Sequence, residues 1–410
     1  MTTRRARVCC LDLDTFFVSV ERLLDPSLQG KAVVVGGHKG GRGVVTSSSY
    51  EARAFGVRSG MSIRDASALA PDAIFMPGHH EHYASYSRGA REIVERFSPI
   101  VVAASIDEQY IDFHGCESLY RKPEDADDDA TILRVVHTMT RTIGDELGLP
   151  ASAGLATSSS LAKVACTLAK PRGVRFVAPG EEEAFLAPLP VRKLPGIGPV
   201  SEAKLARKGI VTLADLARAP DALLRPIFGA HTAGIRRDAR GAGPADLGRE
   251  RPAFREHDPR GLSLGSISNE RTFVETSPRD TASILCGLCE RVCARARSRG
   301  VRAGSVTLRL RYVDFETITR SRVITPTNVD LEVHRAVLAL YRRARTRRLA
   351  VRLLGIALSK LSLEGPQLDL PTMDGGARRA RTVDAVREKY GYDAVHFATT
   401  TERKKRRYAD

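Results

Sequence analysis

The spacing of hydrophobic residues predicts alternating strands and helices in the first 180 residues. Residues 7–14 alternate, with Leu11 and Leu13 on one face, which predicts a strand. A short helix over 16–24 is expected to follow, and it should end before Pro26. The same analysis predicts a strand over 32–36, a strand-like segment over 101–113 that the acidic pair Asp107 and Glu108 interrupts, helices over 49–56, 83–97 and 130–147, and a solvated acidic loop over 124–130.

The pattern changes after about residue 180, where short helices alternate with proline and glycine. Residues 244–262 mix proline, glycine and charged residues, which predicts a linker. Alternating residues at 306–312 and 353–361 then predict strands, and apolar residues at helical spacing predict helices over 277–299 and 329–346. The last 45 residues are polar and predict a tail, flexible at its extreme end. These elements indicate a multidomain α+β protein.

Composition is typical of a globular protein of several domains. The chain has 410 residues, 42% of them hydrophobic and 27% charged, which predicts two to four domains. No run approaches the roughly 18 apolar residues of a membrane span, and the N-terminus lacks a signal-peptide core. Seven scattered cysteines, an odd number, argue against a disulfide framework and favour a reducing cytoplasm. Three of them, Cys286, Cys289 and Cys293, have the spacing of a buried helix face.

Positive charge is concentrated in one part of the chain. The net charge is +16, and residues 263–365 hold 19 Arg and Lys against 9 Asp and Glu, a difference of +10. A basic surface of this size favours a polyanion such as nucleic acid as a partner. An Arg-rich proteome would give the same composition, so charge alone leaves both explanations open.

Acidic residues suggest a site for chemistry. Asp12 and Asp14 lie at the end of the first predicted strand, and Asp107 and Glu108 are adjacent within another. If these strands pair, Asp12, Asp107 and Glu108 can converge. Because neighbouring carboxylates repel, such a cluster favours bound Mg²⁺ or Mn²⁺, and two such ions suit phosphoryl displacement. A solvated surface turn is the alternative for the acidic pair.

Four motifs in order resemble the Y-family DNA polymerases, and the nearest class is the DinB type. They are LDLDTFFVSVE (11–21), SSYEARAFGVRSGM (48–61), SIDEQYID (105–112) and AKPRG (169–173). The resemblance implies a right-hand polymerase fold and low-fidelity translesion DNA synthesis without proofreading. It implies a palm at 1–12 and 78–178, fingers at 13–77, a helix-hairpin-helix thumb at 179–243, a linker at 244–262, an α/β little finger at 263–365 and a C-terminal tail at 366–410.

The resemblance also implies which residues act. Asp12, Asp107 and Glu108 would be catalytic and would bind two Mg²⁺ or Mn²⁺ ions together with the Leu13 carbonyl, and Asp14 would contribute to catalysis or make a structural hydrogen bond. Phe17 would be the steric gate that excludes a ribose 2′-hydroxyl. The residues implied to bind the nucleotide are Thr15, Phe16, Phe17, Ser47, Tyr50, Arg53 and Lys170, and those over the nascent base pair are Gly37, Val44 and Thr46.

Partners follow from the same resemblance: primer–template DNA, deoxynucleoside triphosphates and a sliding clamp, with the enzyme itself a monomer. The sequence LPGIGPVSEAKLARKGI (194–210) has the form of a helix-hairpin-helix that holds a DNA phosphate through backbone N–H groups. The implied DNA contacts are Gly196, Gly198, Arg309, Arg311, Arg320, Arg322 and Lys360, and the implied clamp contacts are Gln367, Leu368 and Leu370 of QLDLP.

The chain departs from the family pattern at several positions. Ser159 stands where lysine is common, Gln109 where a small residue is usual, Thr15 where cysteine or tyrosine is common, and Pro371 where the clamp peptide usually has phenylalanine. None of the four is an expected metal ligand. Two alternative functions remain: a catalytically inactive scaffold that binds clamp and DNA, and a helix-hairpin-helix repair protein that binds DNA without polymerising.

Overall fold

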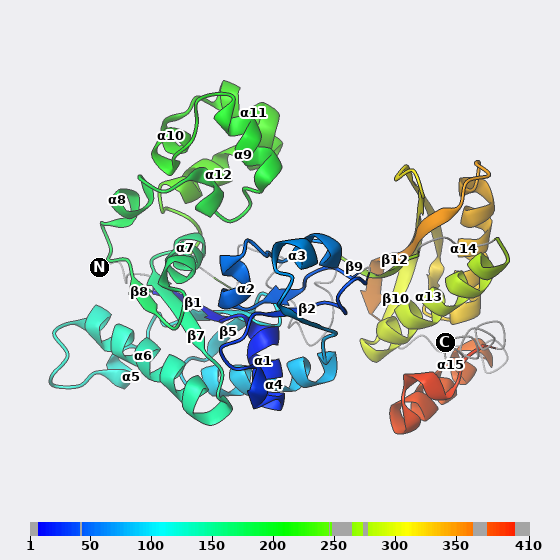
Figure 1. The fold of residues 1–410 in the computed structure, drawn as a ribbon, viewed down its shortest axis with the longest axis horizontal. Coiled ribbons are helices and arrows are strands. Elements are labelled where there is room, and N and C mark those ends of the chain that lie inside the picture. The colour runs from blue at the N-terminus through cyan, green and yellow to red at the C-terminus, as the bar shows by residue number, and fades with distance from the viewer. Residues whose placement is uncertain are drawn as a thin grey trace. The chain divides into compact units, whose positions relative to one another are not determined.

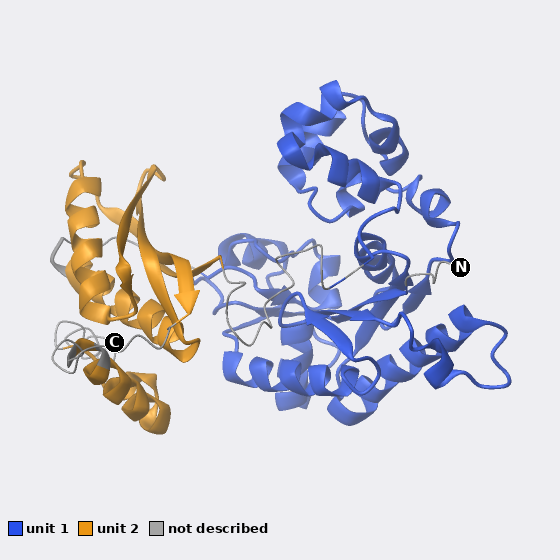
Figure 2. Ribbon diagram, turned by 180° about the vertical axis from the view of Figure 1, so that it is seen from behind, with its two compact units in different colours: residues 1–254 blue, residues 255–410 orange. Residues whose placement is uncertain are grey.

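The computed structural model describes residues 7–41, 43–245, 247, 265–273, 278–363 and 375–397. The chain divides into two compact units, Met1–Phe254 and Arg255–Asp410 (Figure 2). Most of the predicted linker at 244–262 lies outside the described residues. Within the described part of the chain, none of the helices combines the length and the apolar character needed to cross a bilayer.

A five-stranded sheet forms the centre of the first unit, with strand order β5-β6-β1-β7-β8 (Figure 1). Its strands are β1 (Val8–Leu13), β5 (Ile100–Ala103), β6 (Glu108–Asp112), β7 (Ala151–Ala156) and β8 (Val174–Phe176). Helices α1 (Phe16–Leu24), α4 (His80–Val94), α5 (Glu117–Tyr120), α6 (Asp128–Leu147) and α7 (Ser159–Ala169) surround it.

Both faces of β1 are buried, which explains why this strand is apolar except at Asp12. Leu11 and Leu13 pack into one core together with residues of α1, α4 and α6. Cys10 packs into a second core with residues of α7. The predicted period of two is therefore present, and the last position on the Cys10 face is Asp12, where the strand leaves the core.

The start of α6 corrects one prediction. The acidic stretch 124–130 was expected to be a solvated loop, but the helix begins at Asp128, and Asp127 caps it by accepting a hydrogen bond from the N–H of Ala130 at 2.7 Å. Acidic residues in a first helical turn interact favourably with the helix dipole, so the same charges also favour a helix start.

A small sheet with order β3-β2-β4 forms a separate core in the first unit. It consists of β2 (Val33–Val35), β3 (Ser47–Ser48) and β4 (Ile74–Met76), with α2 (Tyr50–Ala54) and α3 (Ile63–Leu69). The glycine-rich loop after β2 depends on Gly36, because its φ is +146° and a Cβ there would lie 2.1 Å from the Val44 carbonyl oxygen.

Short helices follow the central sheet in the chain: α8 (Glu182–Leu186), α9 (Pro199–Ala206), α10 (Leu213–Arg218), α11 (Asp221–Phe228) and α12 (Thr232–Ala239). Leu194 and Ile197 are buried at the turn before α9. Gly196 between them has a φ of +92°, a left-handed conformation that glycine adopts without strain. A short 3₁₀ turn precedes α12.

The second unit contains a four-stranded antiparallel sheet with order β11-β10-β12-β9. Helices α13 and α14 pack on one face, and Cys289 and Cys293 of α13 are buried there, which confirms their predicted packing role. The elements are β9 (Ser266–Thr272), α13 (Pro278–Ser298), β10 (Val301–Tyr312), β11 (Thr317–Thr327), α14 (Asp330–Ala344), β12 (Val351–Leu363) and α15 (Gly375–Tyr390).

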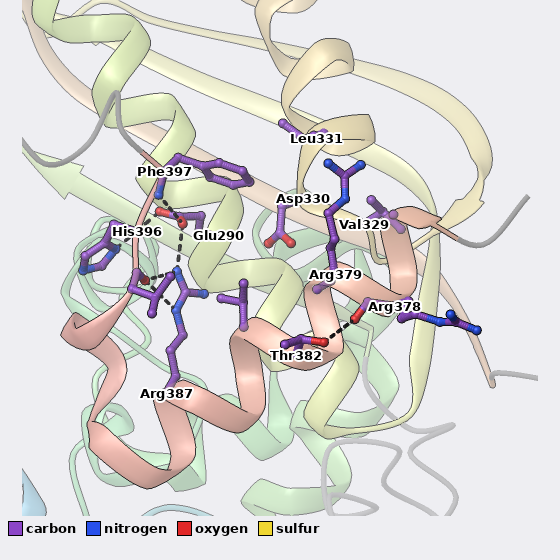
Figure 3. Close-up of a pocket in the computed structure, with 14 residues that line it drawn as sticks. Glu290, Val329, Asp330, Leu331, Arg378, Arg379, Thr382, Arg387, His396 and Phe397 are labelled. Carbon is purple, nitrogen blue, oxygen red and sulfur yellow. Dashed lines mark hydrogen bonds and ion pairs between the residues drawn. The ribbon is translucent and has the colours of Figure 1, made fainter.

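Helix α15 was not predicted, because the sequence after 365 was interpreted as a tail. Arg387 of α15 pairs with Glu290 of α13 at 2.8 Å, and both side chains are buried (Figure 3). Arg297 bonds to Asp384 of α15 and, at 3.0 Å, to Asp330 of α14. A polar helix is thus held by arginine–carboxylate pairs with distant residues, and hydrophobic periodicity carries no signal of such contacts. A cavity of about 390 Å³ lies between these helices.

Candidate active site

The pairing of β1 with β6 brings the first predicted carboxylate to the acidic pair. Asp12 lies directly opposite Glu108 in the antiparallel register. Asp107 forms the turn before β6, and its carbonyl accepts a hydrogen bond from the N–H of Leu13 at 2.9 Å. The side chain of Asp12 is 10% exposed and that of Glu108 is 17% exposed, so both carboxylates lie at the edge of the core.

Two lysines, Lys163 of α7 and its C-cap Lys170, pair with these carboxylates, and Lys163 bridges the two. The Lys163 ammonium is 3.2 Å from Asp12 Oδ2 and 2.5 Å from Glu108 Oε2. The Lys170 ammonium bonds to the other oxygen of Asp12. Burial alone would lower the pKa of Lys163, but Cys10, Glu108 and Asp12 outweigh it and hold that pKa above its ordinary value. The carboxylates are therefore compensated by protein cations.

The donor set is suited to a divalent cation. Carboxylate oxygens of Asp12 and Glu108 converge on the Lys163 ammonium, at the place where a metal ion could bind. The Leu13 carbonyl lies at the end of β1, next to Asp12. Oxygen ligands of this kind are those that Mg²⁺ and Mn²⁺ prefer. Within the described residues, no three His, Cys, Asp or Glu side chains are already gathered as a ready-made metal site. Binding thus requires the lysines to release the carboxylates.

Asp14 makes structural hydrogen bonds. Its side chain is 1% exposed and accepts from the Ser152 hydroxyl at 2.7 Å and from the Arg172 backbone N–H at 2.8 Å. The Tyr50 hydroxyl lies 3.4 Å from its other oxygen. Asp14 therefore links β1, β7 and the loop that carries Lys170. These contacts favour a structural hydrogen-bonding role for Asp14 over a contribution to catalysis.

Tyr50 and Arg53 lie on α2. The Arg53 guanidinium stacks over the Tyr50 ring at 5.1 Å, and its Nε donates to the Ser48 carbonyl at 3.1 Å. Burial, together with the nearby Asp14 carboxylate, raises the pKa of Tyr50 to about 12. Tyr50 is therefore a neutral hydrogen-bond donor at working pH. Ser47 is buried in β3, just before this helix.

Thr15, Phe16 and Phe17 occupy the turn from β1 into α1. Thr15 has a φ of +44°, which makes a sharp turn directly after the carboxylates. Phe16 is 2% exposed and belongs to the core, whereas Phe17 is only partly buried. Its ring stacks on that of Tyr83, with centroids 4.2 Å apart.

The residues expected over the nascent base pair form part of the small sheet and its loop. Val44 is 52% exposed and Thr46 is also exposed, while Val45 between them is buried. The Thr46 hydroxyl donates to the Val35 carbonyl at 2.9 Å. Gly37 is partly exposed and has a φ of +151°. Alternation thus presents two small side chains on one surface.

The predicted DNA contacts of the second unit do not share one face. Arg309 pairs across β10 and β11 with Thr319, and Leu308 pairs with Arg320. Since directly paired residues point to the same side of a sheet, Arg309 and Arg311 lie on the open face, whereas Arg320 and Arg322 lie on the face that carries the helices. Lys360 is exposed within β12, and its φ is +52°.

The remaining predicted contacts are a glycine before α9 and the clamp peptide. Gly198 precedes α9, and a Cβ at this residue would meet nothing within 4 Å. The proposed clamp peptide at 367–371 lies outside the described residues. Of the unusual residues, Gln109 is 3% exposed, and its Oε1 has no hydrogen-bond partner among the described residues. Ser159 is 1% exposed, and its N–H donates to the Pro244 carbonyl.

Sequence reasoning missed Lys163. Its signal is the repeated Ala-Lys at 162–163 and 169–170, since two lysines seven residues apart lie on the same face of one helix. That spacing is common on solvated helices, and only the packing of α7 against β1 and β7 directs this pair toward carboxylates.

Comparison with known proteins places the chain in a family. Residues 11–167 match the impB/mucB/samB family, 179–210 match the IMS family HHH motif, and 265–370 match the impB/mucB/samB family C-terminal domain. The chain is similar over 87% of its length to a solved Y-family DNA polymerase chimera, with a TM-score of 0.72, 23% identity and 99% of that chain covered. This likeness supports the multidomain α+β polymerase fold.

Curated relatives agree over nearly the full length. DNA polymerase IV of Dehalococcoides mccartyi is 37% identical over 402 residues, covering 96% of this chain and 97% of the relative. DNA polymerase IV 2 of Mesorhizobium japonicum is 37% identical over 419 residues, covering 96% of this chain and 94% of the relative. The chain therefore belongs to the impB/mucB/samB family and is a Y-family DNA polymerase of the DinB type.

Proposed function

We propose that this protein extends a DNA primer by template-directed nucleotidyl transfer and copies damaged templates with low fidelity and without proofreading. The observation that carries the proposal is the pairing of Asp12 with Glu108 at the edge of the central sheet, beside Asp107 and two lysines. A solvated surface turn would not place Glu108 opposite a third carboxylate with one ammonium bonded to both.

Asp12, Asp107 and Glu108, with the Leu13 carbonyl, would hold two divalent cations, which we assign as Mg²⁺ with Mn²⁺ as a substitute. When bound, such a pair activates the primer 3′-hydroxyl and neutralises charge on the leaving pyrophosphate. Lys163 and Lys170 would keep Asp12 and Glu108 compensated until then. Because Lys170 already touches Asp12, release of Asp12 would leave its ammonium beside the triphosphate.

The triphosphate would be held by three side chains of different chemistry. Arg53 presents a planar fork to phosphate oxygens, Lys170 a point charge, and Tyr50 a neutral hydroxyl donor. Ser47 and the backbone of residues 15–17 would assist. Phe17 would pack against the sugar and exclude a 2′-hydroxyl by contact alone, and Gly37, Val44 and Thr46 would leave room over the nascent base pair.

DNA would be held by the parts of the chain outside the palm and fingers. We assign residues 179–243 as the thumb, with Gly196 and Gly198 letting a phosphate approach backbone N–H groups, and residues 263–365 as the little finger. Arg309 and Arg311 would contact phosphates from the open face of its sheet. We further propose that QLDLP docks on a sliding clamp and that the enzyme is a cytoplasmic monomer, in keeping with its seven free thiols.

Primer extension with single nucleotides tests this function. The protein is given a primed template and one dNTP at a time, opposite each of the four template bases, with Mg²⁺ or with a chelator. We expect incorporation that follows the template base and stops on chelation. Duplex binding without any incorporation would support the inactive scaffold instead, and incorporation that ignores the template base would contradict the proposal.

A further inference from the structure

The proposed steric gate is held by a second aromatic ring. Phe17 stacks on Tyr83 with centroids 4.2 Å apart and an interplanar angle of 11°. His80 adds an edge contact to Phe17 at 5.9 Å. Tyr83 is fully buried, whereas Phe17 is partly exposed, so the accessible ring rests on one that cannot move without disturbing the core.

Tyr83 is in turn fixed by a buried carboxylate. Its hydroxyl donates to Oε1 of Glu21, a side chain that is 2% exposed. The same carboxylate accepts from the His79 backbone N–H at 3.2 Å and lies 2.9 Å from His79 Nδ1. A buried carboxylate is unfavourable unless its oxygens are satisfied, and here the partners all come from the start of α4.

The arrangement connects Glu21 to Phe17 along one helix. Glu21 follows Phe17 by four residues in α1, so both side chains lie on the same helix face. Glu21 bonds to Tyr83, and the Tyr83 ring stacks on Phe17, so these contacts run from α1 to α4 and back to α1. None of these partners contacts Asp12, Asp107 or Glu108 through a described hydrogen bond, so this set of contacts is separate from the carboxylate site.

We propose that Glu21 and Tyr83 are positioning residues for sugar selection, which hold the Phe17 ring where a ribose 2′-hydroxyl would lie. The inference rests on the proposed role of Phe17 as the steric gate. Exclusion by contact requires a ring that cannot turn aside, because side chains change rotamer readily unless packing locks them. A deoxyribose has no 2′-hydroxyl to exclude, so its incorporation does not require a fixed Phe17 ring. A more mobile ring should therefore change the incorporation of ribonucleotides and leave that of deoxyribonucleotides nearly unchanged.

The test compares kcat/KM for a dNTP and the matching rNTP in single-nucleotide primer extension. Tyr83→Phe keeps the stacked ring and removes only the bond to Glu21. We expect it to raise rNTP incorporation by about fivefold to tenfold, which corresponds to the upper part of the net contribution of a typical intramolecular hydrogen bond, with the dNTP value within about twofold of wild type. Glu21→Leu should match it. Glu21→Gln should stay near wild type, because its amide can still accept from Tyr83.

The matched control is Tyr86→Phe, which removes a hydroxyl from the neighbouring tyrosine on α4. It should leave the dNTP to rNTP ratio unchanged. A merely structural role for Glu21 and Tyr83 would lower both kcat/KM values together and leave their ratio at the wild-type value, which would overturn the proposal. Thermal melting of each variant verifies that it is folded, and Tyr83→Leu offers a second substitution if Glu21→Leu is not.

Phe17→Ala separates failure of this inference from failure of the gate assignment. If Phe17→Ala lowers selectivity but Tyr83→Phe does not, only the positioning role is wrong. If Phe17→Ala leaves selectivity intact, the gate assignment itself is wrong. In the double variant Phe17→Ala/Tyr83→Phe, the effect of Tyr83→Phe should disappear, because it acts through Phe17. Full additivity would contradict the proposed route.

Discussion

Replacing Lys163 with methionine should lower the free energy of unfolding, because it removes a charge that compensates the carboxylates. Methionine keeps an unbranched chain of similar length and removes the charge that lies 3.2 Å from Asp12 and 2.5 Å from Glu108. Lys170 still compensates Asp12, so the main loss is the bond to Glu108. With three quarters of the Lys163 side chain buried, we expect a loss of about 2 to 3 kcal/mol in unfolding free energy.

The assay is thermal unfolding of the metal-free protein with and without Mg²⁺. A loss of that size should lower the Tm by about 5 to 10 °C for a unit of this size. Mg²⁺ should then raise the Tm of the variant more than that of the wild type, because in the variant the cation displaces one ammonium fewer and binds more tightly.

The exposed residue Lys208 supplies a matched control, since Lys208→Met removes the same charge away from the carboxylates. It should change neither the Tm nor the response to Mg²⁺ appreciably. The reasoning fails if Lys163→Met behaves like this control, or if Mg²⁺ stabilises wild type and Lys163→Met by the same amount.

Three further predictions concern other parts of the chain. Arg53→Lys should raise the KM for dNTP by about tenfold while binding DNA normally, because lysine keeps the charge but loses the planar fork; steady-state kinetics that match wild type would show that the fork is not used. Arg309→Ala and Arg311→Ala should each weaken duplex binding for all sequences and reduce the slope of log K against log salt by about 1, as measured by fluorescence anisotropy, whereas an unchanged slope would remove these residues from the interface. Arg134 lowers the pKa of Asp125 through paired hydrogen bonds, so Asp125 contributes stability above its ordinary value of about 3.9 and loses it as the pH falls through the lowered pKa; the Tm difference between wild type and Asp125→Asn should be constant above pH of about 4 and shrink below it, and a difference that grows with acid would contradict this sign.

Local signals in the sequence predicted much of the fold because they have local causes. The helix over 16–24 has the observed bounds, since an apolar face and Pro26 define it without help from distant residues. The interruption of 101–113 at the acidic pair is also correct: β5 ends at Ala103 and β6 begins at Glu108. The convergence of Asp12 with this pair followed once the two strands were assumed to be neighbours.

Features that depend on distant contacts were missed for a physical reason. Helix α15 packs through Arg387 and Asp384 onto residues far away in the chain, and its sequence has no strong apolar face. The bond between Tyr83 and Glu21 joins residues 62 apart. Strand register decides that Arg309 and Arg320 lie on opposite faces, and no property of either residue alone indicates it.

The measurement that tests the central claim most directly is primer extension with all four dNTPs and Mg²⁺, comparing wild type with Asp107→Ala/Glu108→Ala. Anisotropy with the same primed duplex verifies that both proteins bind DNA. The account predicts extension by wild type and loss of at least about a thousandfold in rate for the variant, since removal of metal ligands removes the transition-state charge stabilisation. Equal extension by both proteins would contradict the assignment of the paired carboxylates as holders of the catalytic metals.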